Sequence, residues 1–195
     1  MTTLTDGVIT LRPLERTDRD AIFAAVSESI AEISPWLPWC HPAYAPTETA
    51  AFIESSIQWW AQRSQFVFGI FDAVHGTYIG GTGVNQLNAQ HRYANIGYWV
   101  RTSRTGRGFA PRALRLAARF AFDTLGLQRV EIAAEPENYA SRRVAEKAGA
   151  KLDGLARNRI FKRGRPCPAA LYSLIPEDLI DPPALSARPS TPEIL

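Results

Sequence analysis

The sequence of 195 residues contains little lysine, cysteine, methionine or histidine. Only three of its 22 basic residues are lysines (Lys147, Lys151 and Lys162), and it has two cysteines, one methionine and three histidines. Two cysteines define no disulfide framework, so Cys40 and Cys167 are predicted to be free thiols in a reducing compartment, which indicates a cytoplasmic location. The histidines lack the close spacing of metal ligands, so we expect no metal site.

Long hydrophobic runs are also missing. No apolar stretch approaches the ~20 residues that span a bilayer, and residues 1–7 lack the apolar core of a secretory signal, so no membrane partner is expected. With 46% hydrophobic and 21% charged residues, the composition is that of a globular chain. We predict one domain over residues 1–180. Residues 181–195 contain four prolines and are predicted to form a flexible tail.

Arginine supplies most of the positive charge. The net charge is only +3, yet six arginines lie between Arg101 and Arg119. A genome rich in G and C would explain an arginine excess without any function. The local cluster favours a single anionic ligand, because the guanidinium group binds phosphate through two parallel hydrogen bonds. The nearly neutral balance argues against a nucleic-acid partner.

The hydropathy pattern predicts the order strand, two helices, three antiparallel strands, helix, strand, helix and two strands. Helices that interrupt a mostly antiparallel sheet indicate an α+β fold. Helices are expected over about 18–27, 110–125 and 138–148, and another opens at residue 47. The expected strands are 8–14, 66–72, 78–87, 93–101, 129–134, 155–162 and 169–175.

A glycine-rich turn, Thr-Gly-Arg-Gly-Phe-Ala-Pro at residues 105–111, lies between a predicted strand and a predicted helix. Glycine allows a tight turn and a close approach of the backbone to a ligand. The first N–H groups of a helix have no internal partners and lie at its positive end, so the turn suits a phosphate or pyrophosphate. It lacks both the P-loop and the dinucleotide-binding patterns, and taken alone it also fits an ordinary turn.

This turn belongs to an ordered series of motifs over residues 8–179. The series resembles the GNAT acetyltransferases, and among them the branch of ribosomal-protein N-terminal acetyltransferases (RimJ/RimL-like). The resemblance implies a GNAT fold, in which the central strands 93–101 and 129–134 of a mixed, mostly antiparallel sheet splay apart between flanking helices. The other motifs are Ile9–Leu14, Trp36-Leu37-Pro38-Trp39, Ile79-Gly80, Gly97-Tyr98-Trp99-Val100-Arg101, Asn138-Tyr139-Ala140-Ser141 and Leu171-Tyr172-Ser173-Leu174.

The resemblance also implies an activity. The acetyl group of acetyl-CoA, the co-substrate, would pass to a primary amine by direct attack in a ternary complex, without a metal. The expected acceptor is the N-terminal α-amine of a protein or peptide. A small-molecule amine (an antibiotic, a polyamine or an amino acid) is an alternative acceptor, and a non-catalytic CoA-binding module is an alternative function. A monomer and a homodimer both remain open.

The same resemblance implies the residues that contact CoA. Pantetheine would pair with backbone groups of Trp99 and Arg101, and the amides of residues 106–110 would hold the pyrophosphate. Asn138 would fix the pantetheine or the adjacent backbone, and Arg142 or Arg143 would reach the 3′-phosphate. The implied cofactor-binding set is Trp99, Val100, Arg101, Gly106, Arg107, Gly108, Phe109, Ala110, Asn138, Ser141 and Arg143.

For catalysis, Ser141 is expected to protonate the departing thiolate as a general acid. Asn95 and Ile160 occupy positions where relatives carry acidic residues, so the motifs identify no general base. Glu135 and His41 are the candidate bases, and a water chain is the alternative. The candidate acceptor-binding residues are Trp36, Trp39, Trp59 and Asn85.

Overall fold

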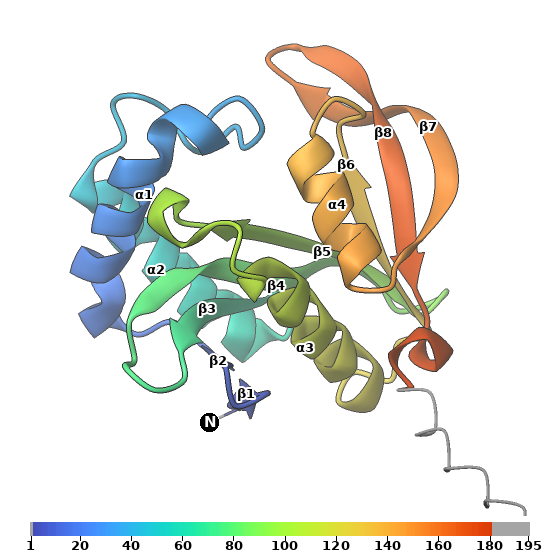
Figure 1. Ribbon diagram of the computed structural model, residues 1–195, viewed down its shortest axis with the longest axis horizontal. Helices are drawn as coiled ribbons and strands as arrows, with labels where there is room; N and C mark the ends of the chain where they lie inside the picture. Colours follow the sequence, from blue (N-terminus) through green and yellow to red (C-terminus); the bar gives the residue numbers. More distant parts are fainter. Residues whose placement is uncertain (1, 181–195) are drawn as a thin grey trace, which may run out of the picture.

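The computed structural model describes residues 2–180, so the predicted flexible tail at 181–195 lies outside the described residues. Its centre is an eight-stranded sheet with the order β1-β2-β3-β4-β5-β6-β8-β7 (Figure 1). Neighbouring strands are antiparallel except for β5 and β6, which are parallel. The strands are β1 Leu4–Thr5, β2 Ile9–Arg12, β3 Phe66–Asp72, β4 Tyr78–Asn88, β5 Tyr93–Val100, β6 Arg129–Ala134, β7 Lys151–Lys162 and β8 Arg165–Leu174.

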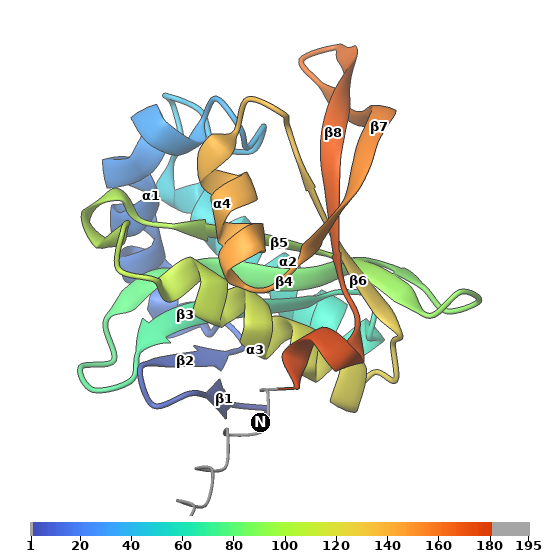
Figure 2. The same ribbon diagram turned by 45° about the vertical axis from the view of Figure 1, so that its right-hand side comes forward.

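Two hydrophobic clusters separate the helices onto the two faces of the sheet. One cluster joins α1 and α2 to Phe71 and Tyr78, and the larger one joins α3 and α4 to Phe68, Ile96 and Tyr172. The sheet is therefore the middle layer of three, as Figures 1 and 2 show. The helices are α1 Arg19–Ile33, α2 Pro46–Gln62, α3 Phe109–Asp123 and α4 Tyr139–Lys147, with 3₁₀ turns η1 Arg16–Asp18, η2 Thr102–Arg104 and η3 Pro176–Leu179.

The predicted α+β class is confirmed, and the predicted elements occur in the expected order after one additional short strand, β1. The largest differences in bounds are at the end of α1 and at the starts of β7 and β8, of which β8 begins at Arg165 rather than 169. Helix α1 continues six residues beyond the predicted end at 27, because Ile30 and Ile33 pack onto the α1–α2 cluster. Strand β7 begins at Lys151 rather than 155. Register shifts in its pairing with β8 break the alternation of apolar and polar residues on which the prediction depended.

The arginines that repeat at helical spacing on α3 are held by specific contacts, although their spacing also suits a solvated face. Arg112 pairs with Asp6 at 2.7 Å, and Arg115 donates to the Ala148 carbonyl at 3.2 Å. Arg119 donates to a carbonyl of η3 at 3.4 Å. These three arginines therefore connect α3 to segments from both ends of the described chain.

The central strands part soon after they meet. Strands β5 and β6 pair only at Tyr93, Ala94 and Asn95 of β5, opposite residues 129–131 of β6. Among the described strands, β4 alone pairs with β5 from Ile96 onward, and Figure 2 shows β5 and β6 diverging. The splayed strand pair implied by the sequence is therefore present, and it positions the site. No helix within residues 2–180 combines the length and apolarity needed to cross a membrane.

Candidate active site

A cavity of about 560 Å³ lies where β5 and β6 separate. It reaches from the end of α1 and Trp36, past the open half of β5, to the loop 102–111 and α4. Of the residues that the sequence singled out, the cavity is lined by Trp36, Trp99, Val100, Gly106, Gly108, Phe109, Ala110, Glu135, Asn138, Ser141 and Arg143.

The loop before α3 has the conformation that an anion site requires. Gly106 and Gly108 have φ angles of +74° and +78°, which L-residues with a side chain rarely adopt. Gly108 is the N-cap of α3, and no side chain caps the first N–H groups of the helix. These donors therefore remain available to a phosphate. The Arg107 side chain is exposed and does not line the cavity, so only its backbone takes part in the turn.

Two cations of α4 line the same cavity. Arg143 and Lys147 are four residues apart, which places them on one face of the helix. Within residues 2–180 neither is paired with a carboxylate. Arg142, the alternative to Arg143 in the sequence, instead donates to the Tyr172 hydroxyl at 3.1 Å and to the Pro136 carbonyl at 2.9 Å. The positive charge at this wall comes from Arg143 and Lys147.

The register of β5 decides which peptide groups face the gap. The Arg101 N–H donates to the Ile79 carbonyl of β4 at 2.8 Å, and Trp99 lies opposite Gly81 in the same ladder. Because residues of an antiparallel ladder alternate in the direction of their peptide groups, those of Tyr98 and Val100 point away from β4. The structure thus differs from the expected use of Trp99 and Arg101: the free backbone groups belong to their neighbours.

The Arg101 side chain also points away from the cavity. Its guanidinium pairs with Glu28 of α1 and donates to the Tyr78 carbonyl at 3.4 Å. Arg101 is not among the residues that line the cavity. Its place in the structure is at the junction between β5 and α1, not at a ligand.

Ser141 lies in the first turn of α4, where two neighbours fix it. The Asn138 side chain caps the helix by accepting the Ser141 N–H at 3.0 Å. The Tyr98 hydroxyl donates to the Ser141 carbonyl at 2.8 Å and lies 3.2 Å from Oγ. Burial raises the pKa of Tyr98 to about 12, so the phenol is protonated at neutral pH. The polar groups of Asn138 and Tyr98 thus position Ser141 beside the gap.

The opposite end of the cavity is bridged by a lysine. Lys162, at the end of β7, forms an ion pair with Glu135 and donates to the Pro35 carbonyl at 2.9 Å. Its ammonium lies 5.6 Å from the ring centre of Trp36. The Lys162 and Glu135 side chains are only 11% and 14% exposed. The two contacts of Lys162 join the end of β7 to the residue directly after β6 and to the segment after α1. Trp36 and Leu37 of that segment line the cavity.

Two predicted tryptophans lie outside the cavity lining. Trp39 packs edge-to-face on Trp99, with ring centres 5.8 Å apart, so it supports a lining residue from behind. Trp59 packs on Phe52 at 6.2 Å, on the helix α2. The turns at 34–40 determine where Trp39 lies, and the course of α2 determines where Trp59 lies. Neither could be predicted from the sequence.

Asn85 and His41 also have partners away from the cavity lining. The Asn85 side-chain oxygen accepts a hydrogen bond from Asn95 at 3.0 Å, and it is Asn95 that lines the cavity. His41 Nε2 lies 2.9 Å from a Glu48 carboxylate oxygen. The structure therefore brings Glu135, but not His41, to the cavity.

Comparison with known proteins identifies the family. Residues 9–151 match the family model described as "Acetyltransferase (GNAT) domain". The chain is a GNAT acetyltransferase. The resemblance inferred from the motifs is therefore confirmed.

Similar proteins cover nearly the whole acetyltransferase. It is 29% identical to the Bacillus subtilis (strain 168) protein named "Putative ribosomal N-acetyltransferase YdaF", over 86% of this chain and 91% of that one. A structure of a putative ribosomal-protein-serine acetyltransferase from Vibrio cholerae is 25% identical with a TM-score of 0.79, over 90% and 98% of the two chains. Mycobacterium smegmatis RimJ in complex with CoA-disulfide is 26% identical with a TM-score of 0.80, over 92% and 88%.

The acetyltransferase takes its acetyl group from acetyl-CoA and transfers it to an amine. Its described residues fit that donor. The loop with Gly106 and Gly108 would present free amides to a pyrophosphate, Arg143 and Lys147 would add positive charge, and the open edge of β5 would offer backbone groups to an amide-containing arm. Within residues 2–180 no group of three or more His, Cys, Asp or Glu side chains is arranged to hold a metal ion.

Four residues that line or adjoin this site were not predicted from the sequence: Tyr98, Lys147, Lys162 and Glu28. Tyr98 belongs to one of the predicted motifs, but no role was predicted for it. Side chains alternate along a strand, so Tyr98 and Trp99 lie on opposite faces of the sheet. Glu28 contacts Arg101, and Lys162 contacts Pro35, in both cases more than seventy residues away along the chain. No local sequence pattern reveals such contacts. The signal for Lys162 was its rarity, since it is one of three lysines in the chain.

Proposed function

We propose that the acceptor of this acetyltransferase is the N-terminal α-amine of a protein or peptide. The observation that carries the proposal is its similarity, over nine-tenths of the chain, to the Vibrio cholerae protein named "putative ribosomal-protein-serine acetyltransferase". The acceptor end of the cavity supports it. Trp36, Leu37 and Ile160 give that end an apolar lining, and the carboxylates of Glu32 and Glu135 also line the cavity, which suits a chain end that carries an amine.

In this proposal the two walls of the gap orient the donor. When bound, acetyl-CoA supplies an activated thioester carbonyl. The peptide groups of Tyr98 and Val100 hold the arm of the donor along β5, and an N–H of this open edge is placed to stabilise a developing oxyanion. The amides of residues 106–110 and the side chains of Arg143 and Lys147 hold the phosphates. The enzyme thereby keeps donor and acceptor together, which supplies a large part of the acceleration.

Ser141 is the proposed general acid. Tyr98 gives its proton to the Ser141 carbonyl, which fixes the first turn of α4, and its phenol oxygen lies 3.2 Å from Ser141 Oγ. The Ser141 hydroxyl hydrogen can turn from the phenol oxygen into the gap, pass to the departing thiolate and be replaced by a proton from solvent. Glu135 is the proposed acceptor of the amine proton, either directly or through water, and Lys162 fixes its carboxylate in place.

An acceptor screen tests the proposal. The enzyme is mixed with acetyl-CoA and lysine-free peptides that begin with Ser, Ala or Met, and free thiol and peptide mass are followed. The same peptides with a blocked α-amine are the matched controls. Acetylation of open but not blocked peptides is expected. Turnover only with small amines such as spermidine, an aminoglycoside or free amino acids would replace the proposed acceptor, and CoA binding without thiol release would indicate a non-catalytic module.

The same proposal places the enzyme in the cytoplasm, where protein N-termini are exposed during synthesis. Cys40 and Cys167 are both free thiols, which suits a reducing compartment.

A further inference from the structure

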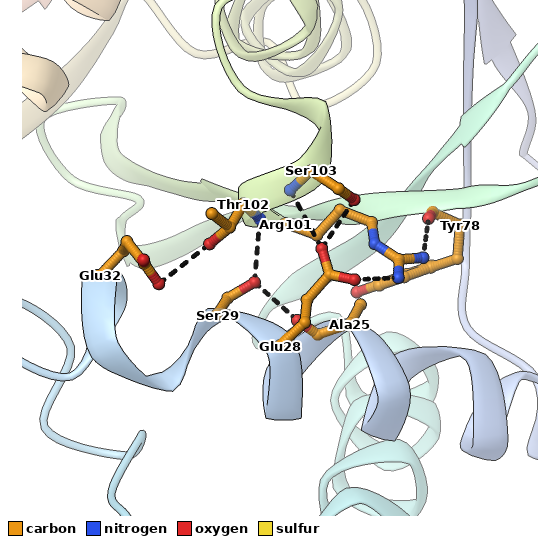
Figure 3. A network of polar contacts seen from close by, with 8 residues as sticks. All are labelled: Ala25, Glu28, Ser29, Glu32, Tyr78, Arg101, Thr102 and Ser103. Atoms are coloured by element: carbon orange, nitrogen blue, oxygen red, sulfur yellow. Dashed lines mark hydrogen bonds and ion pairs between the residues drawn. The ribbon is translucent and has the colours of Figure 1, made fainter.

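The turn η2 leads into the glycine-rich turn at residues 105–111, which we call the phosphate-binding loop. The N–H groups of η2 that have no partner inside the turn donate to side chains of α1. The Thr102 N–H donates to Ser29 Oγ of α1 at 3.0 Å, and the Ser103 N–H donates to the Glu28 carboxylate at 3.1 Å. Ser29 Oγ in turn donates to the Ala25 carbonyl at 2.7 Å (Figure 3). Side chains of α1 therefore satisfy donors that a short helical turn leaves without internal partners.

Glu28 is the centre of this network. Its carboxylate accepts from the Ser103 hydroxyl at 2.8 Å as well as from the Ser103 N–H, and it pairs with the Arg101 guanidinium (Figure 3). Arg101 also donates to the Tyr78 carbonyl, so the carboxylate is linked to β4. The hydrogen bond from Arg101, aided by those from Ser103, lowers the pKa of Glu28 to about 2. Glu28 is thus a carboxylate throughout the neutral range.

Beyond the turn, the Thr105 hydroxyl donates back to the Thr102 carbonyl at 2.9 Å, and the glycines that follow have open space around them. A Cβ atom added at Gly106 or Gly108 would meet no atom within 4 Å. The Arg107 side chain is exposed. The shape of the loop is therefore set at its two ends, by α3 on one side and by the contacts of η2 with α1 on the other.

The helix that holds the turn also walls the acceptor end of the cavity. Glu32, one helical turn after Glu28, accepts a hydrogen bond from the Thr102 hydroxyl at 3.1 Å. Glu32, Ile33 and Thr102 all line the cavity. One face of α1 thus touches the entrance of the phosphate-binding loop, and the next residues along the helix touch the space for the acceptor.

We propose that Glu28 is a positioning residue for acetyl-CoA: acting with Ser29, it holds η2 against α1 and so keeps the phosphate-binding loop in its binding conformation before the donor arrives. A loop that is ordered in advance loses less conformational entropy on binding, which appears as affinity. Backbone amides bind a pyrophosphate well only when they already converge on it. The inference rests on donor binding at residues 106–110 and not on the identity of the acceptor.

The test measures the affinity for CoA by calorimetry, without any acceptor. Glu28→Ala removes every contact of the carboxylate and is expected to raise Kd for CoA about tenfold, since small misplacements of binding groups have effects of this size or larger. Glu28→Gln keeps an oxygen for Ser103, but it loses the charge and replaces the oxygen that accepts from Arg101 with an NH2 donor, so its Kd is expected to lie between parent and Glu28→Ala. In turnover assays the KM for acetyl-CoA should rise in the same order, while kcat at saturating acetyl-CoA changes less than KM.

Glu54→Ala is the matched control. Glu54 of α2 also forms an ion pair between segments, with Arg16 at 2.6 Å, and neither residue lines the cavity. Its loss should leave Kd for CoA unchanged. Parent-like Kd in both Glu28 variants would overturn the proposal, and so would an equal rise in the Glu54→Ala control, because either result would reduce Glu28 to a stabilising contact. If Glu28→Ala fails to fold, Glu28→Gln decides alone. Failure of the acceptor screen leaves this measurement intact.

Discussion

The Tyr98 hydroxyl donates to the carbonyl of Ser141 at 2.8 Å, across the gap between β5 and α4. The bond joins a strand that has lost its partner to the first turn of a helix that walls the opposite side. It also leaves the phenol oxygen 3.2 Å from Ser141 Oγ. One tyrosine therefore links β5 to α4 and lies beside the proposed acid.

Replacing Ser141 with alanine removes the proposed acid without disturbing the helix cap, since the cap uses the Ser141 N–H. We expect kcat to fall about 100-fold, at the low end of the range for a general acid, while Kd for CoA stays within about twofold of the parent. Steady-state kinetics and calorimetry measure the two quantities. Equal kcat in the variant and the parent would remove Ser141 from the mechanism.

Tyr98→Phe should lower kcat by a smaller factor, about tenfold, because Ser141 keeps its hydroxyl but loses the group that orients it. Tyr93→Phe on the same strand is the control and should retain parental kcat. Because the pKa of Tyr98 is raised to about 12, the neutral phenol is present at all pH values below 10 and is lost only as pH rises toward 12. Any alkaline loss of activity below pH 10 must come from another group, which a pH–rate profile of both variants would show.

The lowered pKa of Glu28 gives a second pH prediction. A carboxylate whose pKa is about 2 in the folded protein, against 4.5 ordinarily, contributes its full stabilisation above pH 4.5 and loses it as pH falls toward 2. The affinity for CoA should therefore show no titration of Glu28 between pH 5 and pH 8. Calorimetric titrations of parent and Glu28→Gln should run parallel over this range. Curves that converge near pH 6 would contradict the pairing with Arg101.

A negative side chain in the phosphate-binding loop should abolish donor binding. Gly108→Asp places a carboxylate at the N-cap of α3, where the proposed pyrophosphate lies, and adds backbone strain of about 1–2 kcal/mol because φ is positive. Gly76→Asp, in the turn between β3 and β4, carries the same kind of strain at φ +65° and is far from the loop in sequence. Loss of CoA binding in Gly108→Asp alone is expected. Retained affinity would refute the site assignment.

The two tryptophans Trp36 and Trp59 provide a test of the acceptor end. Trp36 lines the cavity and lies under the Lys162 ammonium, whereas Trp59 packs on Phe52. Trp36→Ala should raise the KM for the acceptor about tenfold or more, in line with the loss of a large aromatic contact. Trp59→Ala should leave it unchanged. The reverse result would move the acceptor site to the outer surface of α2.

The sequence predicted the elements better than the contacts between them. The turn at 105–111 carries local signals, namely two glycines, a proline and a following amphipathic run, and these determine its conformation directly. Arg101 and Arg107 have no comparable signal. Whether an arginine faces a ligand or a carboxylate depends on α1, more than seventy residues earlier in the chain, and no periodicity encodes that pairing.

The open backbone groups show the same limit on a finer scale. A shift of one residue in the register of β5 exchanges the peptide groups that face β4 with those that face the gap. The strand itself was predictable from its hydropathy. Its register, in which Gly80 and Gly81 lie opposite Val100 and Trp99, was not. The sequence therefore predicted the strand with the open edge, but not which of its residues have backbone groups that face the gap.

The parting of β5 and β6 gives the sheet an edge in its interior. An exposed edge strand normally invites pairing with another chain, yet this one faces a cavity walled by α4 and the 102–111 loop. Its amide protons at Tyr98 and Val100 lack the strand partner that slows exchange with solvent, although they lie at the middle of an eight-stranded sheet. In exchange experiments, the centre of this sheet should behave as an edge until the donor molecule takes the place of the missing strand.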